Sequence, residues 1–260
     1  MPRYFIEVCY RGTNYSGFQV QQNANSIQAE VTNALAVFFH GQFELTGSSR
    51  TDAGVHALQN FFHFDIVIEG ATGKNFITGM ESRDVVYHLN SILPADIVIK
   101  RIFPVAEHAH CRFDATDREY HYHIYLHKDP FLKDRAYYYP FKLDPEKLRS
   151  ASQIILSYVE FDAFCKKNSQ SGNTRCTIKK SEWTGGSDLL IYKVISNRFL
   201  RGMVKGLVGS MLQVATGKTS LEEFESVIQN KDPAYANFSV PAHGLFLMKV
   251  NYNDHIIQYL

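Results

Sequence analysis

The segment 47–57, GSSRTDAGVHA, combines side chains that could do chemistry with glycines that permit tight turns. Its hydroxyl residues can hydrogen-bond to the nearby backbone, which would hold Arg50 and Asp52 in fixed directions. Loops on a rigid scaffold commonly carry functional residues, so Arg50 and Asp52 are candidate site residues. The alternative is a solvated turn in which Asp52 only accepts backbone hydrogen bonds.

The segment 118–125, REYHYHIY, has the alternating pattern of a β-strand. Alternation places Tyr120, Tyr122 and Ile124 on one face of the strand and Glu119, His121 and His123 on the other. A tyrosine that faces a cleft could stack on a nucleobase, an interaction worth about 1–3 kcal/mol per base. The alternative is that these tyrosines only pack in the protein interior.

Two pairs of histidines stand two residues apart, His108 with His110 and His121 with His123. Such pairs can bind a metal, but the sequence shows no matching third ligand or set of cysteines, so we expect no metal site. The four cysteines are too far apart for a metal-binding knuckle or a dense disulfide framework. We therefore predict reduced, mostly buried thiols.

The segment 197–212, NRFLRGMVKGLVGSML, predicts a helix with an apolar row, three glycines, and the cations Arg201 and Lys205 one turn apart. A glycine costs about 1 kcal/mol in a helix interior, so three of them indicate close approach of another backbone. A cation on a buried helix needs an anionic partner, for which Asp52 is a candidate. Lys205 could instead extend along its apolar stem to solvent.

The elements that would position these segments follow the same order in both halves of the chain. Strands are expected at 3–10, 42–46, 57–68 and 96–103, with helices from 27 to Gly41 and at 77–91. Further strands are expected at 118–127, 175–183, 188–196 and 245–252, with helices from Pro145, at 199–216 and after Ser220. Both halves show the β-α-β-β-α-β order of the ferredoxin-like motif.

We therefore predict an α+β fold of two fused ferredoxin-like halves, residues 1–105 and 106–260. The halves would form a mixed, largely antiparallel sheet with a central catalytic cleft. Three helix starts carry capping signals, namely Asn25 with Gln28, Asp144 before a proline, and Ser220 with Glu223.

The composition excludes several classes of protein. Of 260 residues, 45% are hydrophobic and 20% are charged, which argues against a disordered, collagen-like or fibrous chain. No apolar stretch reaches about 18 uninterrupted residues and the N-terminus has no signal-peptide core, so we expect a cytoplasmic protein without a membrane span.

The net charge is only +1, but its distribution is uneven. The segment 166–218 carries ten Lys or Arg against Glu182 and Asp188, which gives it a net charge of +8 and leaves −7 for the rest of the chain. This asymmetry favours a polyanionic partner, although a solvated basic face would look the same.

Six segments together resemble the tRNA pseudouridine synthase A family, which isomerises uridine to pseudouridine in the anticodon arm of tRNA. They are YRGTNYSGFQVQQNANSIQ (10–28), SRTDAGVHA (49–57), LNSILPADIVI (89–99), AHCRFDATDREYHYHIY (109–125), NRFLRGMVKGLVG (197–209) and AHGLFLMKV (242–250). The run RTDAGVH is highly specific to that family.

The resemblance implies that Asp52 is the catalytic aspartate, that Arg50 helps to hold the flipped-out nucleotide, and that Tyr120 stacks against the target uracil. It also implies a homodimer that binds tRNA across both subunits and that uses no metal or organic cofactor.

Three residues depart from the family pattern. Lys205 stands where the family carries an arginine of the catalytic site, so the positive charge is kept but the bidentate guanidinium is lost. Arg11 replaces an aspartate of the first motif, and Phe18 replaces a tryptophan. These changes are reasons to consider an altered choice of substrate.

We therefore expect an enzyme that isomerises uridine in the anticodon stem-loop of tRNA. Two alternatives stay open. One is a non-catalytic RNA-binding protein, because ferredoxin-like sheets with exposed aromatics bind RNA, although retention of Asp52 argues against it. The other is a pseudouridine synthase that acts on a different uridine or RNA.

Overall fold

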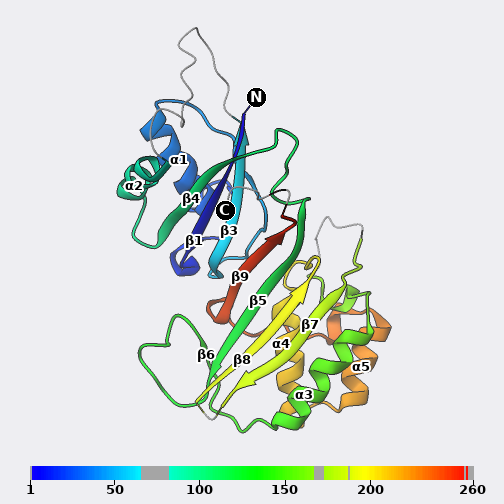
Figure 1. Ribbon diagram of the computed structural model, residues 1–260. Coiled ribbons are helices and arrows are strands. Elements are labelled where there is room, and N and C mark those ends of the chain that lie inside the picture. The colour runs from blue at the N-terminus through cyan, green and yellow to red at the C-terminus, as the bar shows by residue number, and fades with distance from the viewer. Residues whose placement is uncertain (1, 66–81, 167–172, 187, 255, 257–260) are drawn as a thin grey trace. The chain divides into compact units, whose positions relative to one another are not determined.

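The structure is a computed structural model that describes residues 2–65, 82–166, 173–186, 188–254 and 256. The chain forms two compact units, of which unit 1 comprises Met1–Thr116 and Leu247–Leu260 and unit 2 comprises Asp117–Phe246 (Figure 1). The chain changes unit within a strand each time, first in β5 (Ala115–Tyr125) and then in β9 (Leu245–Tyr252). The predicted halves 1–105 and 106–260 divide the chain by element order and stay a prediction.

Unit 1 contains a sheet in which β4 (Ile97–Val105), β1 (Arg3–Tyr10), β3 (His56–Asp65) and β9 lie in that order. The strand β1 is antiparallel to β3 and to β4, and the two-residue strand β2 (Thr46–Gly47) pairs with β3. The helices α1 (Ile27–Phe39) and α2 (Ser82–Ile92) contact each other, and α2 also contacts β4. A 3-10 turn, Gly12–Asn14, follows β1.

The strand β1 is covered on both faces, which explains its nearly continuous apolar sequence. On one face Phe5 packs against Phe61 and Tyr252, with ring centroids 6.3 and 5.8 Å apart. On the other face Tyr4 stacks against Phe64 at 5.8 Å. Because alternate residues of a strand face opposite sides, this one strand contributes to two layers of the core.

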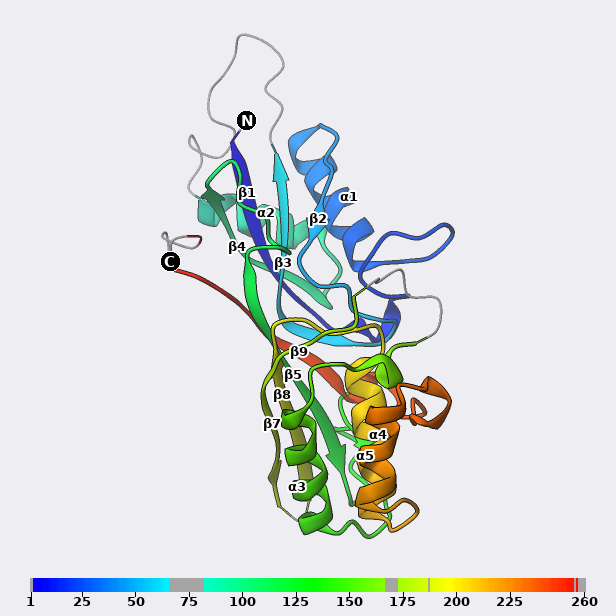
Figure 2. The same cartoon turned by 90° about the vertical axis from the view of Figure 1, so that its right-hand side faces the viewer.

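Unit 2 contains a sheet in which β5, β8 (Leu189–Ser196) and β7 (Ile178–Gly185) lie in that order, with antiparallel neighbours. A two-residue strand, β6 (Tyr137–Tyr138), runs parallel to β5. The helices α3 (Pro145–Ile154), α4 (Met203–Ala215) and α5 (Leu221–Asn230) lie together on one face of this sheet (Figure 2). Short 3-10 turns lie at Ile155–Ser157, Asp162–Phe164, Pro233–Tyr235 and Ala242–Gly244.

The predicted α+β class with largely antiparallel strands is confirmed. The order β-α-β-β-α-β is present from β1 to β4, and again from β5 to β9 with the strand β6 and the helix α5 added. Two capping predictions are also confirmed. The carboxylate of Asp144 accepts the N–H groups of Glu146 and Lys147, and Ser220 forms a reciprocal capping box with Glu223.

Other details of the prediction are wrong. The N-cap of α1 is Ser26, whose Oγ accepts from the N–H of Ala29 at 3.3 Å, and not Asn25. The side chain of Gln28 instead donates to the carbonyl of Leu45. The strand predicted at 42–46 is reduced to β2, and β6 was not predicted. Residues 66–68 of the predicted strand and 77–81 of the predicted helix lie outside the described residues.

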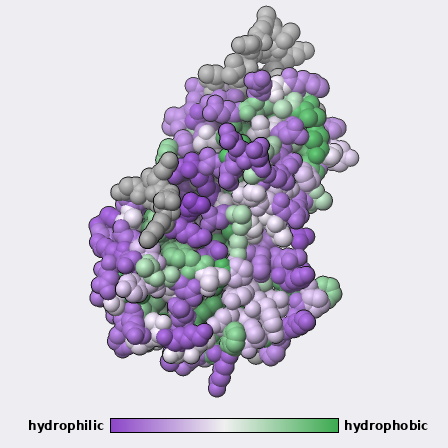
Figure 3. All heavy atoms as spheres, turned by 180° about the vertical axis from the view of Figure 1, so that it is seen from behind, coloured by the Kyte–Doolittle hydropathy of each residue, from purple (hydrophilic) through white to green (hydrophobic). Residues whose placement is uncertain are grey.

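In the part of the chain that the structure describes, no helix has both the length and the apolar character that a membrane span requires. On the face drawn in Figure 3, hydrophilic residues predominate and apolar residues form separate small groups. The four cysteines are free thiols, as predicted, with Cys111 and Cys176 buried and Cys9 and Cys165 half-buried.

Candidate active site

Arg50 and Asp52 lie on one loop of unit 1, between the end of β2 and the start of β3. The side chain of Arg50 is exposed and that of Asp52 is half-buried. The carbonyl of Asp52 accepts a hydrogen bond from the N–H of Val55 at 3.2 Å, and Gly54 adopts a positive φ of 78°. The chain therefore turns tightly directly after Asp52, with glycine at the position that needs the left-handed conformation.

The segment that follows β1 braces this loop on both sides of Asp52. The carbonyl of Thr51 accepts from the N–H of Phe18 at 3.1 Å, and the N–H of Gly54 donates to the carbonyl of Tyr15 at 3.3 Å. The hydroxyls of Thr51 and Tyr10 are hydrogen-bonded at 2.8 Å in a buried position. These contacts fix the backbone that carries the Asp52 carboxylate, which is the condition for a pre-organised site.

A buried asparagine links the loop to the strands beneath it. Asn60 is fully buried, and its amide nitrogen donates to the carbonyl of Ser49 at 2.9 Å and to the hydroxyl of Tyr10 at 3.2 Å. Its amide oxygen accepts from the hydroxyl of Ser48 at 2.7 Å. Burial raises the pKa of Tyr10 to about 12, so this hydroxyl keeps its proton at neutral pH.

The sequence prediction missed Asn60 and Tyr10 as positioning residues. The available signal was a buried polar residue within the apolar run of β3, because such a group must find partners.

Glycines allow the bracing segment to approach the loop. A Cβ atom added to Gly12 would lie 2.0 Å from the carbonyl oxygen of Val55, so any side chain there would clash with backbone. The N–H of Gly12 donates to Nδ1 of His56 at 3.2 Å. Gly17 adopts a φ of 111°, and an added Cβ would lie 3.1 Å from the carbonyl oxygen of Thr51.

Two residues that depart from the expected family pattern lie in the same bracing segment. Phe18 is buried and stacks on Phe62 with ring centroids 4.6 Å apart, and its ring fills the space beside Gly47. The ring of Phe18 therefore packs against the start of the loop that carries Asp52. Arg11 is exposed, and its backbone N–H donates to the carbonyl of Asp96 at 2.9 Å.

Tyr120 lies on β5 in unit 2. Its side chain is on the buried face of the strand with Tyr122 and Ile124, as the alternation predicts. Tyr120 is 8% exposed, whereas Tyr122 is fully buried. The hydroxyl of Tyr122 donates to the carbonyl of Pro241 at 2.7 Å. The ring of Phe199 meets Tyr120 edge to face, with centroids 4.9 Å apart and planes at 80°. Tyr120 is thus a nearly buried aromatic ring that packs against Phe199.

Lys205 lies in the first turn of α4 and is half-buried. Burial lowers the pKa of His243, and the nearby positive charge of Lys205 lowers it further. The predicted pairing of Arg201 with Lys205 on one helix face is wrong, because α4 begins at Met203. Gly202 precedes it in the left-handed conformation, with φ at 75°.

The glycines within α4 do mark close contacts, as predicted. An added Cβ on Gly209 would lie 2.1 Å from the carbonyl oxygen of Asn237, and one on Gly206 would lie 2.8 Å from the ring of Phe238. These contacts hold the helix that carries Lys205 against the segment between the 3-10 turns Pro233–Tyr235 and Ala242–Gly244.

The four predicted site residues therefore fall into two pairs. Arg50 and Asp52 share a loop of unit 1, and Tyr120 and Lys205 lie on a strand and a helix of unit 2. The expected ion pair between Asp52 and Lys205 would join the two units, and it stays a prediction.

A family model described as tRNA pseudouridine synthase matches residues 8–114 and 159–253. The chain belongs to the tRNA pseudouridine synthase family. The match includes the Asp52 loop, the segment that braces it, and α4, whereas Tyr120 lies between the two matched ranges.

Curated relatives extend this similarity to nearly the whole chain, and each is named tRNA pseudouridine synthase A. The protein of Parabacteroides distasonis is 37% identical over 259 residues, which cover 98% of both chains. The protein of Porphyromonas gingivalis is 37% identical over 254 residues, 97% of this chain and 98% of the relative. That of an Exiguobacterium species is 33% identical over 252 residues, with the same coverage.

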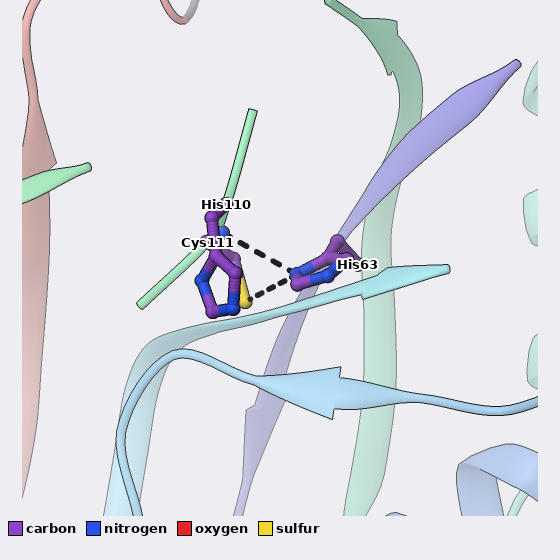
Figure 4. A group of neighbouring side chains, drawn as sticks. All are labelled: His63, His110 and Cys111. Carbon is purple, nitrogen blue, oxygen red and sulfur yellow. Dashed lines mark hydrogen bonds between the residues drawn. The ribbon is translucent and has the colours of Figure 1, made fainter. Parts of the chain in front are cut away.

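A second cluster of chemically active side chains lies in unit 1, where His63, His110 and Cys111 point toward one another (Figure 4). Nδ1 of His63 lies 3.1 Å from Sγ of Cys111 and accepts from the N–H of Cys111 at 3.3 Å. Burial lowers the pKa of His63 to about 4 and also lowers the pKa of His110. Both imidazoles are therefore neutral at neutral pH. Among the described residues, this is the group of side chains that could hold a metal.

Proposed function

We propose that this protein isomerises uridine to pseudouridine in the anticodon stem-loop of tRNA. The observation that carries the proposal is the Asp52 loop, in which a half-buried carboxylate stands on a backbone braced on both sides by the segment Tyr10–Phe18. A carboxylate held in this way can act on a substrate without first ordering its own loop. Membership of the tRNA pseudouridine synthase family supports the same reaction.

The reaction rearranges bonds within one nucleotide. The bond between uracil N1 and the ribose C1′ breaks, the uracil turns, and a bond forms between C5 and C1′. The hydrogen on C5 leaves as a proton and N1 gains one, so no electrons enter or leave. The protein must extrude the nucleotide, which costs a few kcal/mol of stacking, and must supply a group that acts on the sugar or the ring.

Asp52 is the residue proposed to act on the nucleotide. Its carboxylate can attack the sugar, attack the uracil ring, or remove the proton from C5, and each role needs it to be held beside the extruded base. Arg50 is exposed two residues away on the same loop, where its guanidinium can bind a phosphate of the extruded nucleotide.

Tyr120 and Lys205 are proposed to complete the site from unit 2. The ring of Tyr120 is held in place by Phe199 and would stack against the uracil, which offsets part of the cost of extrusion. Lys205 would pair with Asp52 through a single ammonium group, whereas an arginine would present two parallel N–H groups to the carboxylate.

The start of α4 favours an anion and is a proposed contact with the tRNA backbone. Gly202 offers no side-chain cap, and the first turn of α4 contains no acidic residue. Lys166 packs its stem over Gly202, and its N–H donates to the carbonyl of Arg201 at 3.0 Å. The two cationic residues Lys166 and Arg201 thus lie beside the N-terminus of α4, which is the positive end of the helix dipole. A bound phosphate would stabilise this arrangement of positive charge.

We also propose that the protein is a homodimer in the cytoplasm, with tRNA bound across both subunits. Sedimentation of the free protein tests the dimer. A mass corresponding to one chain at working concentration would contradict it.

The proposed function is tested by release of tritium from transcribed tRNA labelled at uracil C5. Isomerisation displaces this hydrogen, so we expect release that is proportional to the pseudouridine formed. An RNA-binding protein without activity would shift the mobility of the tRNA and release nothing. A synthase for another RNA would release tritium from total cellular RNA labelled in the same way but not from tRNA.

A further inference from the structure

We infer that His63, His110 and Cys111 form a binding site for a divalent metal ion of the zinc type. This site differs from the expectation of no metal, which rested on histidine pairs close together in the sequence. The structure supplies the missing ligands, because it places His63 of β3 beside two consecutive residues of the loop between β4 and β5. The site is separate from the Asp52 loop and does not depend on the proposed function.

The geometry is close to that of a metal site. The ligand atoms of the three residues all lie within 4.8 Å of one another. Zinc bound to nitrogen at about 2.0–2.1 Å and to sulfur at about 2.3 Å separates its ligands by roughly 3.3–3.7 Å in a tetrahedron. Nδ1 of His63 and Sγ of Cys111, at 3.1 Å, are already near this separation, and the ligand atom of His110 lies within 4.8 Å of the other two.

The types of ligand and their burial select the metal. One thiolate and two imidazoles suit zinc and related borderline metals and are poor ligands for magnesium or calcium. Cys111 is fully buried, His63 is 6% exposed and His110 is half-buried, so the ion would be shielded on the protein side and open to one water. Three protein ligands and one open position are a common zinc coordination.

The surrounding charges tolerate a cation. Arg3 lies nearby and donates to the carbonyl of Ala109, but its guanidinium is held by both carboxylate oxygens of Asp65 at 2.7 Å, so this pair adds no net charge. The carboxylate of Asp114 accepts the N–H of His110 at 2.7 Å. Together with the thiolate of Cys111, this carboxylate balances the charge of a divalent ion.

Metal binding changes four hydrogen bonds. The thiol of Cys111 donates to the carbonyl of Thr46 at 3.1 Å, and binding releases this proton to solvent as the metal–sulfur bond forms. Nδ1 of His110 accepts the amide hydrogens of Arg112 and Phe113, so the metal takes Nε2, and the proton of that nitrogen moves to Nδ1. Binding therefore releases one proton per ion and frees these two amides, and it also frees the N–H of Cys111, because its acceptor, Nδ1 of His63, becomes a ligand.

The experiment uses the full chain without an affinity tag, stripped with a chelator and titrated with Co²⁺. Thiolate-to-cobalt charge transfer gives a near-ultraviolet absorption only when a cysteine is a ligand. We expect this absorption to saturate at one equivalent and to disappear when Zn²⁺ is added. Zn²⁺ should also raise the melting temperature of the protein, because it binds the folded state.

Two variants identify the site. Cys111→Ala should abolish the absorption and the effect of Zn²⁺ on the melting temperature, and His63→Gln should weaken both at least tenfold. Cys176→Ala is the matched control, because Cys176 is also a buried free thiol and burial raises its pKa to about 11. It should behave as the parent protein does. Circular dichroism in chelator confirms that each variant is folded.

The inference is overturned if the parent protein shows no charge-transfer absorption, or if Cys111→Ala keeps it. Loss of the absorption in Cys176→Ala rather than in Cys111→Ala would place the metal elsewhere and would also overturn it. Hydrogen exchange gives a second measure, since the amides of Arg112 and Phe113 should exchange faster with Zn²⁺ bound. Unchanged exchange at these amides would contradict the ligation by His110.

Discussion

The position of the Asp52 carboxylate depends on its neighbours rather than on Asp52 itself. Thr51 is anchored through both its carbonyl and its hydroxyl, and the hydroxyl is bound to Tyr10. Tyr10 in turn accepts from Asn60, which also holds the carbonyl of Ser49. The hydroxyl of Tyr10 therefore connects Asn60 of β3 to Thr51, the residue beside Asp52.

Tyr10→Phe removes that hydroxyl and leaves the rest of the ring in place. We expect kcat to fall about tenfold while the Kd for tRNA is unchanged, because the loop loosens but the RNA contacts stay. The free energy of unfolding should fall by about 1–2 kcal/mol. Tyr4→Phe is the control, as Tyr4 is a buried tyrosine of the same strand whose ring packs on Phe64. Equal kcat for the two variants would show that Tyr10 does not position the loop.

Lys205 is the residue at which this chain departs from the expected family site. If its ammonium pairs with Asp52, Lys205→Met leaves a carboxylate without its partner, and activity should fall at least about a hundredfold. Lys205→Arg keeps the charge and should retain activity within about tenfold. Tritium release by both variants provides the comparison. Activity of the methionine variant equal to that of the parent would mean that Lys205 only packs.

At the scale of elements, periodicity and capping residues predicted most of the structure. The buried row Met203, Leu207 and Met211 and the caps Asp144 and Ser220 follow from local sequence alone. The start of α4 could not be predicted in this way. The helix begins only at Met203, because Gly202 before it adopts a left-handed conformation, and the spacing of apolar residues does not reveal such a conformation.

The candidate site was predictable to a similar extent. The composition of the 47–57 loop identified Asp52 and Arg50, but not the residues that brace it. Tyr10 is distant from the 47–57 loop along the chain, and it meets Asn60 only through the pairing of β1 with β3. The same limit applies to His63 and Cys111, whose proximity arises from folding and has no local signature.

Close packing of α4 gives a prediction about this element. Gly209→Ala places a methyl group 2.1 Å from the carbonyl oxygen of Asn237 and should lower the free energy of unfolding by about 1–3 kcal/mol. Gly41→Ala, whose added Cβ has its nearest contact at 3.7 Å, should change stability little. Urea unfolding measures both. Equal stability of the two variants would mean that α4 moves freely to accept the methyl group.

At the scale of the whole molecule, the basic segment 166–218 is partly neutralised by its own acidic neighbours. Lys179 binds Asp117 at 2.8 Å and Lys180 binds Glu182 at 2.8 Å, so charge reversal at these two lysines would disturb the fold as well as RNA binding. Arg175 pairs with Glu160 at 3.2 Å. The cations around the start of α4 are therefore better positions at which to test binding.

The affinity for tRNA should fall steeply between roughly 50 and 200 mM salt, because phosphate contacts release counterions. Arg201→Gln should weaken tRNA binding. It should also reduce, by about one, the slope of the logarithm of the binding constant against the logarithm of the salt concentration, which is called the salt slope here. Arg149→Gln is the control, since Arg149 is an exposed arginine paired with Glu146 on α3. A salt slope that is identical in the two variants would exclude the start of α4 from the RNA interface.

Tritium release by Asp52→Asn tests directly whether the carboxylate of Asp52 carries out the isomerisation. This change keeps the size of the side chain and leaves the braced backbone and the basic surface in place. We predict a rate below about a hundredth of the parent rate, with unchanged tRNA affinity and unchanged unfolding. Asp84→Asn, at an exposed aspartate of α2, should keep the parent rate. A rate for Asp52→Asn near that of the parent would mean that Asp52 does not carry out the chemistry.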